Sequence, residues 1–266
     1  MIVIAVAGAG GRMGRMLVSG IAGADDLTLG AAFEGPDSEY LGADAGALAG
    51  IGATGVSVNA KPEACTEDFD VLVDFSVATA TLEKLVVCRD NGKAMVIGTT
   101  GFEPAGLAAI AGAAEAVPIV MAPNMSVGVN VTFKLIESAA RALGDEVDVE
   151  VFEAHHRHKI DAPSGTAVRM GEILADTLGR DLSTDAVYGR EGITGARDGR
   201  TIGFHSLRGG DIVGEHTVTF AGTGERIEIT HRAGSRENFA AGALRAVRFV
   251  VGREPGLYGM DDVLGL

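Results

Sequence analysis

The segment IVIAVAGAGGRMGR, residues 2–15, decides the fold. It begins with a short apolar run typical of a buried strand, passes through a glycine loop and enters the apolar periodicity of a helix. The glycines of the loop are Gly8, Gly10, Gly11 and Gly14. Glycines at a strand-to-helix turn let backbone N–H groups approach a pyrophosphate at the positive end of the helix. The segment therefore predicts a dinucleotide-binding βαβ unit.

The spacing of the loop is Gly8-xx-Gly11-xx-Gly14, because Met13 stands where the commoner pattern has its third glycine. Glu34 follows twenty residues after Gly14, at the end of the next predicted strand. There its carboxylate would accept hydrogen bonds from the adenosine ribose and repel a 2′-phosphate. The alternative interpretation is a tight turn with an ordinary surface glutamate.

Short apolar runs alternate with helix-length segments through the first 125 residues, which predicts a mostly parallel sheet. The predicted strands are 2–8, 27–34, 70–76, 94–100 and 118–124, and the predicted helices are 12–22, 78–91 and 103–115. The turns GTTGF (98–102) and APNMS (122–126) lie where open α/β sheets bind ligands. We expect them to line the nicotinamide half of a dinucleotide, although each can also be a structural turn.

The rest of the chain has a different pattern, with Gly-rich turns between short strands. The predicted elements are a helix over 127–143 that stops at Gly144, a strand over 148–156, a helix from Ser164 to about Leu178, three antiparallel strands within 201–233, and a final helix over 235–251. The predicted fold class is α/β: a Rossmann-like doubly wound parallel sheet plus a second α+β domain with a mixed, largely antiparallel sheet.

Composition limits the class of protein. A chain of 266 residues with a net charge of -14 is not expected to grip nucleic acid or an anionic membrane. No apolar run is long enough to span a bilayer, and the N-terminus lacks the basic start of a signal peptide, so a cytoplasmic location is expected. Cys65 and Cys88 have no metal-type spacing, and we expect both to be buried thiols in a reducing compartment.

Basic residues are concentrated late in the chain, within residues 150–236. Local cations there could offset the overall negative charge for an acidic small molecule. A solvated face on a second domain is the alternative.

The stretch EAHHRHKIDAPSGTA, residues 153–167, carries the most chemical information. It places His155, His156 and His158 among cationic neighbours, and Ser164 at the start of a helix. Such a density of cations is costly in a core and fits a site that binds an anion. Ser164 is a candidate N-cap, and the N–H groups that follow it form a candidate carboxylate site.

Three interpretations of this stretch compete. Zinc binding is disfavoured because adjacent histidines at a strand end point to opposite faces and no cysteine lies nearby. A solvated basic surface is possible. A site that binds an acid and moves a proton is favoured, since histidine titrates near neutral pH and Lys159 can donate a proton whereas arginine cannot.

These motifs, with the terminal LYGMDDVLGL, resemble the 4-hydroxy-tetrahydrodipicolinate reductase (dihydrodipicolinate reductase) family of the bacterial diaminopimelate and lysine pathway. The resemblance covers nearly the whole chain in order. It implies reduction of a cyclic, unsaturated imine dicarboxylate to tetrahydrodipicolinate by hydride from NADH or NADPH. It also implies a homotetramer built through the sheet of the second domain, and a cofactor domain (1–126 and 236–266) interrupted by a substrate-binding and oligomerisation domain (127–235). Because zinc binding is disfavoured by the residues themselves, no metal is expected.

The resemblance implies roles for individual residues. His155 would donate or accept a proton and Lys159 would donate one. The substrate would be held by His156, Ser164, Gly165 and Thr166. The cofactor would lie against Gly8, Ala9, Gly10, Gly11, Arg12, Met13, Glu34, Gly98, Thr99, Thr100, Ala122, Pro123, Asn124 and Met125.

One departure bears on the cofactor. Family members that use NADPH well tend to carry Arg directly after the acidic residue, whereas this chain has Gly35 after Glu34. We therefore expect NADH to be preferred or used equally. Two other functions stay open: a non-catalytic dinucleotide-sensing module, and another Rossmann oxidoreductase acting on an aspartate-derived substrate.

Overall fold

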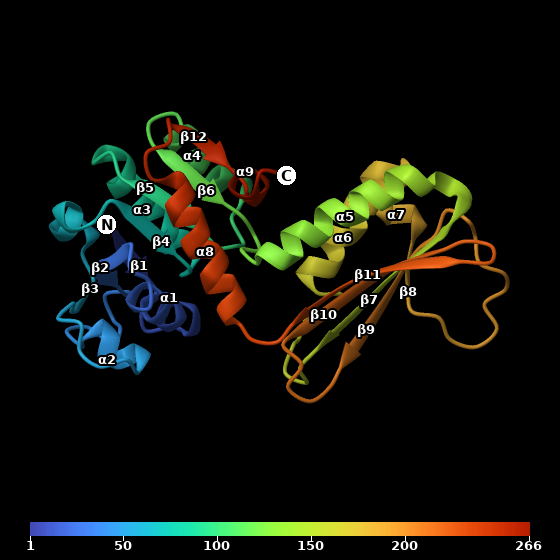
Figure 1. The fold of residues 1–266 in the computed structure, drawn as a ribbon, viewed down its shortest axis with the longest axis horizontal. Coiled ribbons are helices and arrows are strands. Elements are labelled where there is room, and N and C mark those ends of the chain that lie inside the picture. The colour runs from blue at the N-terminus through green and yellow to red at the C-terminus, as the bar shows by residue number, and fades with distance from the viewer. The chain divides into compact units, whose positions relative to one another are not determined.

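The computed structural model describes residues 1–266 and divides them into two compact units. The first unit consists of Met1–Val127 and Glu237–Leu266, and the second is Gly128–Arg236 (Figure 1).

The first unit is built on a seven-stranded sheet in the order β12-β6-β5-β4-β1-β2-β3, and every pairing in it is parallel. Its strands are β1 Ile2–Ala7, β2 Leu27–Phe33, β3 Val58–Asn59, β4 Val71–Asp74, β5 Ala94–Ile97, β6 Pro118–Met121 and β12 Gly256–Tyr258. The strand order reverses direction between β1 and β4, which is the position where doubly wound sheets bind ligands.

Helices cover both faces of this sheet. They are α1 Arg12–Ala22, α2 Ala45–Ala49, η1 Pro62–Asp68, α3 Ala78–Asp90, α4 Pro104–Ala113, α8 Glu237–Val250 and α9 Met260–Leu264. Leu17 of α1 and Val247 of α8 bury with one side of the strands, whereas Leu85 of α3 and Ile110 of α4 bury with the other. The two cores confirm a doubly wound parallel sheet.

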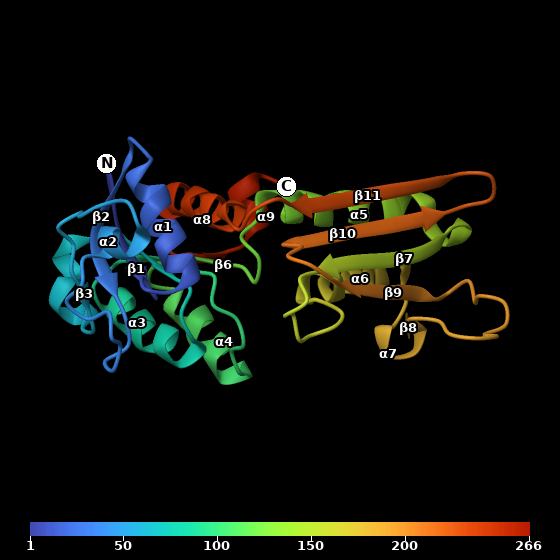
Figure 2. The ribbon, with the colours of Figure 1, turned by 90° about the horizontal axis from the view of Figure 1, so that it is seen from below.

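The second unit contains a five-stranded sheet in the order β11-β10-β7-β9-β8. Its elements are α5 Val127–Leu143, η2 Gly144–Glu146, β7 Asp148–His155, α6 Gly165–Leu178, α7 Leu182–Asp185, β8 Ala186–Tyr188, β9 Ile202–Arg208, β10 Gly214–Ala221 and β11 Arg226–Ala233. Helices α5 and α6 lie along one face of this sheet (Figures 1 and 2). Figure 1 shows no helix on the other face.

The predicted strand pairing in this unit is partly wrong. Strands β9, β10 and β11 exist, and β10 pairs with β11 antiparallel, but β9 does not pair with β10. Strand β7 lies between them, antiparallel to β10 and parallel to β9. The sheet is therefore mixed, as predicted, with two antiparallel and two parallel pairings.

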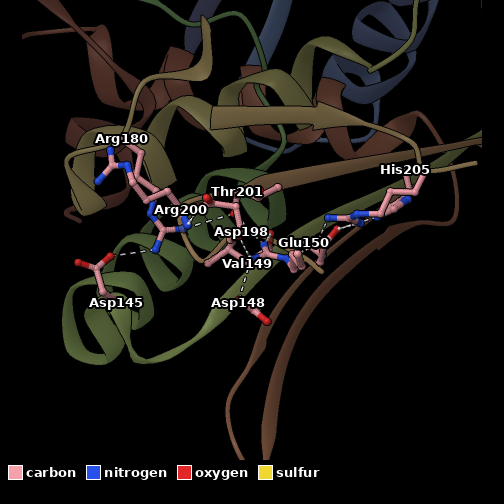
Figure 3. Close-up of polar contacts among 11 residues, drawn as sticks. Asp145, Asp148, Val149, Glu150, Arg180, Asp198, Arg200, Thr201 and His205 are labelled. Atoms are coloured by element: carbon pink, nitrogen blue, oxygen red, sulfur yellow. Dashed lines mark hydrogen bonds and ion pairs between the residues drawn. The ribbon is translucent and has the colours of Figure 1, made fainter. Parts of the chain in front are cut away.

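The segment between β8 and β9 is held to the helix-free face of the sheet by an ion-pair network (Figure 3). Glu150 of β7 accepts hydrogen bonds from Arg190 and Arg197 of that segment and lies 2.7 Å from Nε2 of His205. Burial acts to raise its pKa, but the hydrogen bonds from Arg190, Arg197 and His205 lower the pKa of Glu150 to about 2.

Two further predictions concern the cysteines and the membrane. Cys88 is buried, as predicted, but Cys65 is only partly buried because it lies in the irregular turn η1 at the edge of the first unit's core. No helix combines the length and apolar character needed to span a bilayer.

Candidate active site

The glycine loop takes the shape that the sequence predicts. Gly8 follows β1 with a φ of 73°, a left-handed conformation that favours glycine. The N–H of Gly11 bonds to the carbonyl of Gly8 at 3.0 Å and closes the turn. A Cβ on Gly14 would lie 2.0 Å from the oxygen of Gly8, so only glycine lets α1 pack this closely on the loop.

The N-terminus of α1 fits a bound pyrophosphate. Its N-cap is Gly11, which has no side chain to cap the helix, and its first turn contains no acidic residue. The first N–H groups of a helix need an acceptor, and the helix dipole favours an anion there. Nothing in the local sequence of α1 competes with a phosphate for these groups.

Glu34 lies directly after β2 and beside the loop. Its Oε1 accepts the N–H of Gly10 at 2.8 Å, which brings the carboxylate to the place predicted for the ribose-binding residue. Tyr40 covers Gly10, and Arg15 packs over the Tyr40 ring at 5.3 Å while donating to the Gly10 carbonyl. Tyr40 and Arg15 were not predicted from the sequence as neighbours of the loop.

Arg12 is exposed in the first turn of α1. It lines a cavity of about 670 Å³ between α1 and α8, together with Arg15 and Arg248. Ala9 is fully buried beneath the loop, while Met13 is partly buried against the core.

The predicted nicotinamide turns follow β5 and β6, at the same carboxyl edge of the sheet as the glycine loop. Gly98 packs against the ring of Phe75, where a Cβ would not fit. The hydroxyl of Thr99 points inward and bonds to the buried carboxylate of Asp74 at 3.1 Å, whereas Thr100 is exposed. Thr99 can thus offer a ligand its backbone but not its hydroxyl.

The second predicted turn, residues 122–126, packs against α8. Ala122 and Met125 are buried, and Pro123 is exposed between them. A Cβ on Gly242 of α8 would lie 1.7 Å from the carbonyl of Met125, which shows that α8 packs directly on the backbone of this turn. Asn124 stabilises the turn by accepting the N–H of Ser126 at 2.9 Å.

In the second unit, His155 is the last residue of β7 and is 9% exposed. Its Nδ1 lies 2.6 Å from Oε2 of Glu153, and its ring packs edge-to-face on His216 at 5.1 Å. Burial lowers the pKa of His155, while the hydrogen bond and charge of Glu153 act to raise it.

Helix α6 begins beside this pair. Ser164 is its N-cap, as predicted, and its hydroxyl accepts the N–H of Ala167 at 3.2 Å. The same hydroxyl lies 2.9 Å from Nε2 of His216. Burial is the main cause, and the charge of the neighbouring His155 the next, that lowers the pKa of His216 to about 3. His216 therefore stays neutral.

The remaining residues of the stretch are more accessible. Lys159 is partly exposed, with Nζ 2.9 Å from Asp161 Oδ1. His156 lies 3.4 Å from the guanidinium of Arg236, while His158 is exposed. Gly165 is exposed and Thr166 is partly buried in the first turn of α6. No group of three or more His, Cys, Asp or Glu side chains is arranged to hold a metal ion.

Sequence reasoning missed three residues that contact the predicted ones: Glu153, Arg208 and His216. A signal for Glu153 was present, because it shares the inward-facing positions of its strand with Val149 and Val151. An acidic side chain at such a position needs partners. Arg208 and His216 had no comparable signal, since their proximity depends on the pairing of β7 with β9 and β10.

Comparison with known proteins finds matches over nearly the whole chain. Residues 2–125 match the family model described as "Dihydrodipicolinate reductase, N-terminus", and residues 128–264 match "Dihydrodipicolinate reductase, C-terminus". The chain belongs to the dihydrodipicolinate reductase family. It is 61% identical over 263 residues to the 4-hydroxy-tetrahydrodipicolinate reductase of Alkalilimnicola ehrlichii, with 99% of this chain and 98% of that protein covered. The reductase of Aromatoleum aromaticum is 59% identical, with 99% and 95% covered.

Family membership decides among the functions left open by the sequence. The chain is an oxidoreductase that reduces 4-hydroxy-tetrahydrodipicolinate with a nicotinamide cofactor, in diaminopimelate and lysine biosynthesis. The sensing module and the other oxidoreductase are therefore set aside. The fold is also that of the solved structure "Dipicolinate bound Dihydrodipicolinate reductase" from Paenisporosarcina sp. TG-14, with a TM-score of 0.79, 24% identity and 98% of each chain covered.

Proposed function

We propose that His155 and Lys159 handle the protons of this reduction and that the start of α6 holds a carboxylate of the substrate. The observation that carries the proposal is the meeting of the end of β7 with the first turn of α6: the Glu153 carboxylate contacts both His155 and the N–H of Ser164. A proton-transfer group and an anion-binding helix end therefore lie together.

The two proposed catalytic residues have different protonation chemistry. Because burial lowers its pKa, His155 is neutral near pH 7, with its proton on the Nδ1 that faces Glu153. Its Nε2 then carries a lone pair and accepts a proton or a hydrogen bond. Lys159, with its ammonium group partly exposed, is the proton donor. A bound reduced nicotinamide supplies the hydride, and Lys159 supplies the proton that balances the added electrons.

The substrate is a small dicarboxylate, and two features can receive its charges. One carboxylate lies at the N–H groups of Gly165 and Thr166, with Ser164 fixing the helix end. The other lies near His156, whose ring is next to the Arg236 guanidinium. The Paenisporosarcina reductase is described as dipicolinate-bound, and dipicolinate as its ligand supports a substrate of this class.

The first unit is proposed to bind the dinucleotide, and the second to bind substrate and to assemble. The pyrophosphate lies on the loop from Gly8 to Met13, and the adenosine ribose at Glu34. Gly98 to Thr100 and Ala122 to Met125 line the nicotinamide half. Since Glu34 repels a 2′-phosphate and Gly35 brings no guanidinium, NADH is used at least as well as NADPH.

Assembly into a homotetramer is proposed through the helix-free face of the second unit's sheet (Figure 1). Phe152 and Leu207 are exposed on neighbouring strands of this sheet. Exposed apolar side chains on a sheet face that no helix covers favour burial against another copy. The free thiols fit a cytoplasmic location.

The catalytic assignment is tested by His155→Gln and Lys159→Ala. Each should lower kcat by about 10²- to 10⁴-fold, because a positioned acid or base contributes that much, while the affinity for NADH stays unchanged. Thr166→Ala should act mainly on KM. The matched control is His158→Gln, which changes an exposed histidine of the same stretch and should keep kcat. If both catalytic variants keep kcat within about threefold of the parent, the assignment is wrong.

A further inference from the structure

Glu153 is a buried carboxylate that contacts both His155 and the N–H of Ser164 but neither transfers a proton nor binds the substrate in the proposed chemistry. It lies on the inward face of β7, and its side chain is 1% exposed. Its Oε2 is 2.6 Å from Nδ1 of His155 and accepts from Arg208 at 2.8 Å. Its Oε1 accepts from Arg208 at 2.7 Å and from the N–H of Ser164 at 3.2 Å. Each carboxylate oxygen of Glu153 thus has two hydrogen-bond partners.

The charge of Glu153 is held in place by these donors. Burial acts to raise its pKa, but hydrogen bonds from Arg208, Ser206 and His155 lower the pKa of Glu153 to about 2. A buried ion pair seldom stabilises a fold more than well-packed apolar residues would. Stability alone therefore gives little reason for a carboxylate at this position, whereas its contacts with the substrate site give one.

The first consequence concerns the imidazole of His155. An ionised carboxylate can only accept a hydrogen bond, so Nδ1 of His155 must carry the ring proton. Nε2 of the neutral ring is then unprotonated and carries a lone pair. The same contact fixes the orientation of the ring. Nε2 points toward the start of β10, where a Cβ on Gly214 would lie 3.0 Å from it.

The second consequence concerns the segment that carries Lys159. Arg208, bound to Glu153 through two nitrogens, also donates to the carbonyl of Asp161 at 2.6 Å. The carboxylate of Asp161 pairs with Lys159 at 2.9 Å. Through the N–H of Ser164, Glu153 also holds the turn that starts α6. One carboxylate is therefore connected to the histidine, to the lysine segment and to the helix end.

We propose that Glu153 is a positioning residue for the reduction: it fixes the tautomer and orientation of His155 and holds the segment from Lys159 to Ser164 at the start of α6, without touching the substrate. This inference rests on the proposed role of His155. Glu153 acts here as the outer carboxylate does in sites where a histidine must present one chosen nitrogen.

The test compares Glu153→Gln with Glu150→Gln. Glu150 lies three residues earlier on β7, on the opposite face, and contacts two arginines and a histidine, whereas Glu153 contacts one arginine and a histidine. Each substitution therefore removes one carboxylate from an arginine and histidine network. Glu153→Gln should lower kcat about 10- to 100-fold with unchanged NADH affinity. Glu150→Gln should leave kcat and the pH profile unchanged.

The pH profile separates positioning from a merely structural role. Lys159, Arg208 and His216 also face His155, and the charges of Lys159 and Arg208 lower its pKa while that of Glu153 raises it. Removing the Glu153 charge should move the His155 ionisation in kcat/KM to lower pH by about one unit. In ¹⁵N NMR spectra of the whole enzyme, the His155 proton should also redistribute from Nδ1 toward Nε2.

The outcomes distinguish a failure of the positioning role of Glu153 from a failure of the proposed catalytic role of His155. If His155→Gln keeps kcat, the catalytic assignment itself fails. If His155→Gln lowers kcat but Glu153→Gln changes neither kcat, nor the pH profile, nor the tautomer, only the positioning role is overturned. Should Glu153→Gln not fold, Glu153→Asp keeps the charge for Arg208 but is too short to reach Nδ1. The same three measurements then apply to Glu153→Asp, and unchanged values would again overturn the positioning role.

Discussion

Gly35→Arg should shift the cofactor preference toward NADPH. Gly35 directly follows Glu34 and is exposed, and a Cβ at this position would meet nothing within 4 Å. Its φ is not in the left-handed region, so an L side chain fits the backbone without strain. The substitution therefore adds a guanidinium beside the carboxylate of Glu34, which is proposed to bind the ribose, without disturbing the fold.

The size of the shift follows from two opposing charges. A charge-assisted hydrogen bond from arginine to a phosphate contributes about 1.5 to 3 kcal/mol when it is well shielded from water. Residue 35 is exposed, and Glu34 stays beside it, held by the N–H of Gly10 at 2.8 Å. Screening places the effect at the low end, about 1.4 kcal/mol, which corresponds to a tenfold rise in the ratio of kcat/KM for NADPH to that for NADH.

The assay is steady-state oxidation of each reduced cofactor at low ionic strength, for the parent and for Gly35→Arg. Gly35→Gln is the matched control, because it adds a polar side chain that carries no charge. The ratio should rise only for the arginine variant, and added salt should diminish the rise. An unchanged ratio would refute the reasoning about residue 35, and a parent that prefers NADPH tenfold or more would refute the role given to Glu34.

Two further predictions concern the loop and the acid limb of stability. Gly14→Ala should weaken NADH binding, measured by calorimetry, about 10- to 100-fold, because the added Cβ would force the loop away from α1 by roughly 1 Å. The control is Gly112→Ala, whose Cβ would meet nothing within 4 Å and which should leave NADH binding unchanged. Glu150 and Glu153 both have a pKa lowered to about 2 from 4.5, so the stability they contribute is present above about pH 5 and is lost as pH falls from there toward 2. Urea midpoints between those pH values should fall less steeply in Glu150→Gln than in the parent.

The first unit was largely predictable because its information is local. Each strand is a short apolar run, each crossover is one helix, and β1 to β6 follow the order that parallel sheets with right-handed crossovers adopt. The predicted helix 12–22 agrees with α1 residue for residue. The short elements α2, β3, β12 and α9 were missed, since segments of two to five residues carry no measurable periodicity.

The second unit was less predictable because its central pairings are non-local. Nothing in residues 201–233 indicates that a strand from residues 148–155 inserts between β9 and β10. Turn residues predict hairpins between strands that pair with each other. Here the Gly-rich turn after β9 instead leads to β10, which is separated from β9 by β7. The hydrogen bonds of Glu153 with Arg208 depend on that insertion, so the sequence could indicate an inward-facing carboxylate on this strand but not the arginine that pairs with it.

The basic residues concentrated in residues 150–236 were expected to attract an acidic small molecule, but the structure shows most of them paired with carboxylates. Most of these cations are committed to carboxylates of the same unit; the pairs include Arg169 with Glu172, Arg180 with Asp145, Arg190 with Glu150, Arg197 with Asp148, Arg200 with Asp185, Arg208 with Glu153, Arg226 with Glu228 and Arg232 with Glu215. Paired charges produce little long-range field. Arg157 and Arg236 form no such pair and both adjoin His156, one in sequence and the other at 3.4 Å. We therefore infer that attraction of the dicarboxylate depends on this small group and on the first turn of α6, rather than on a generally positive surface.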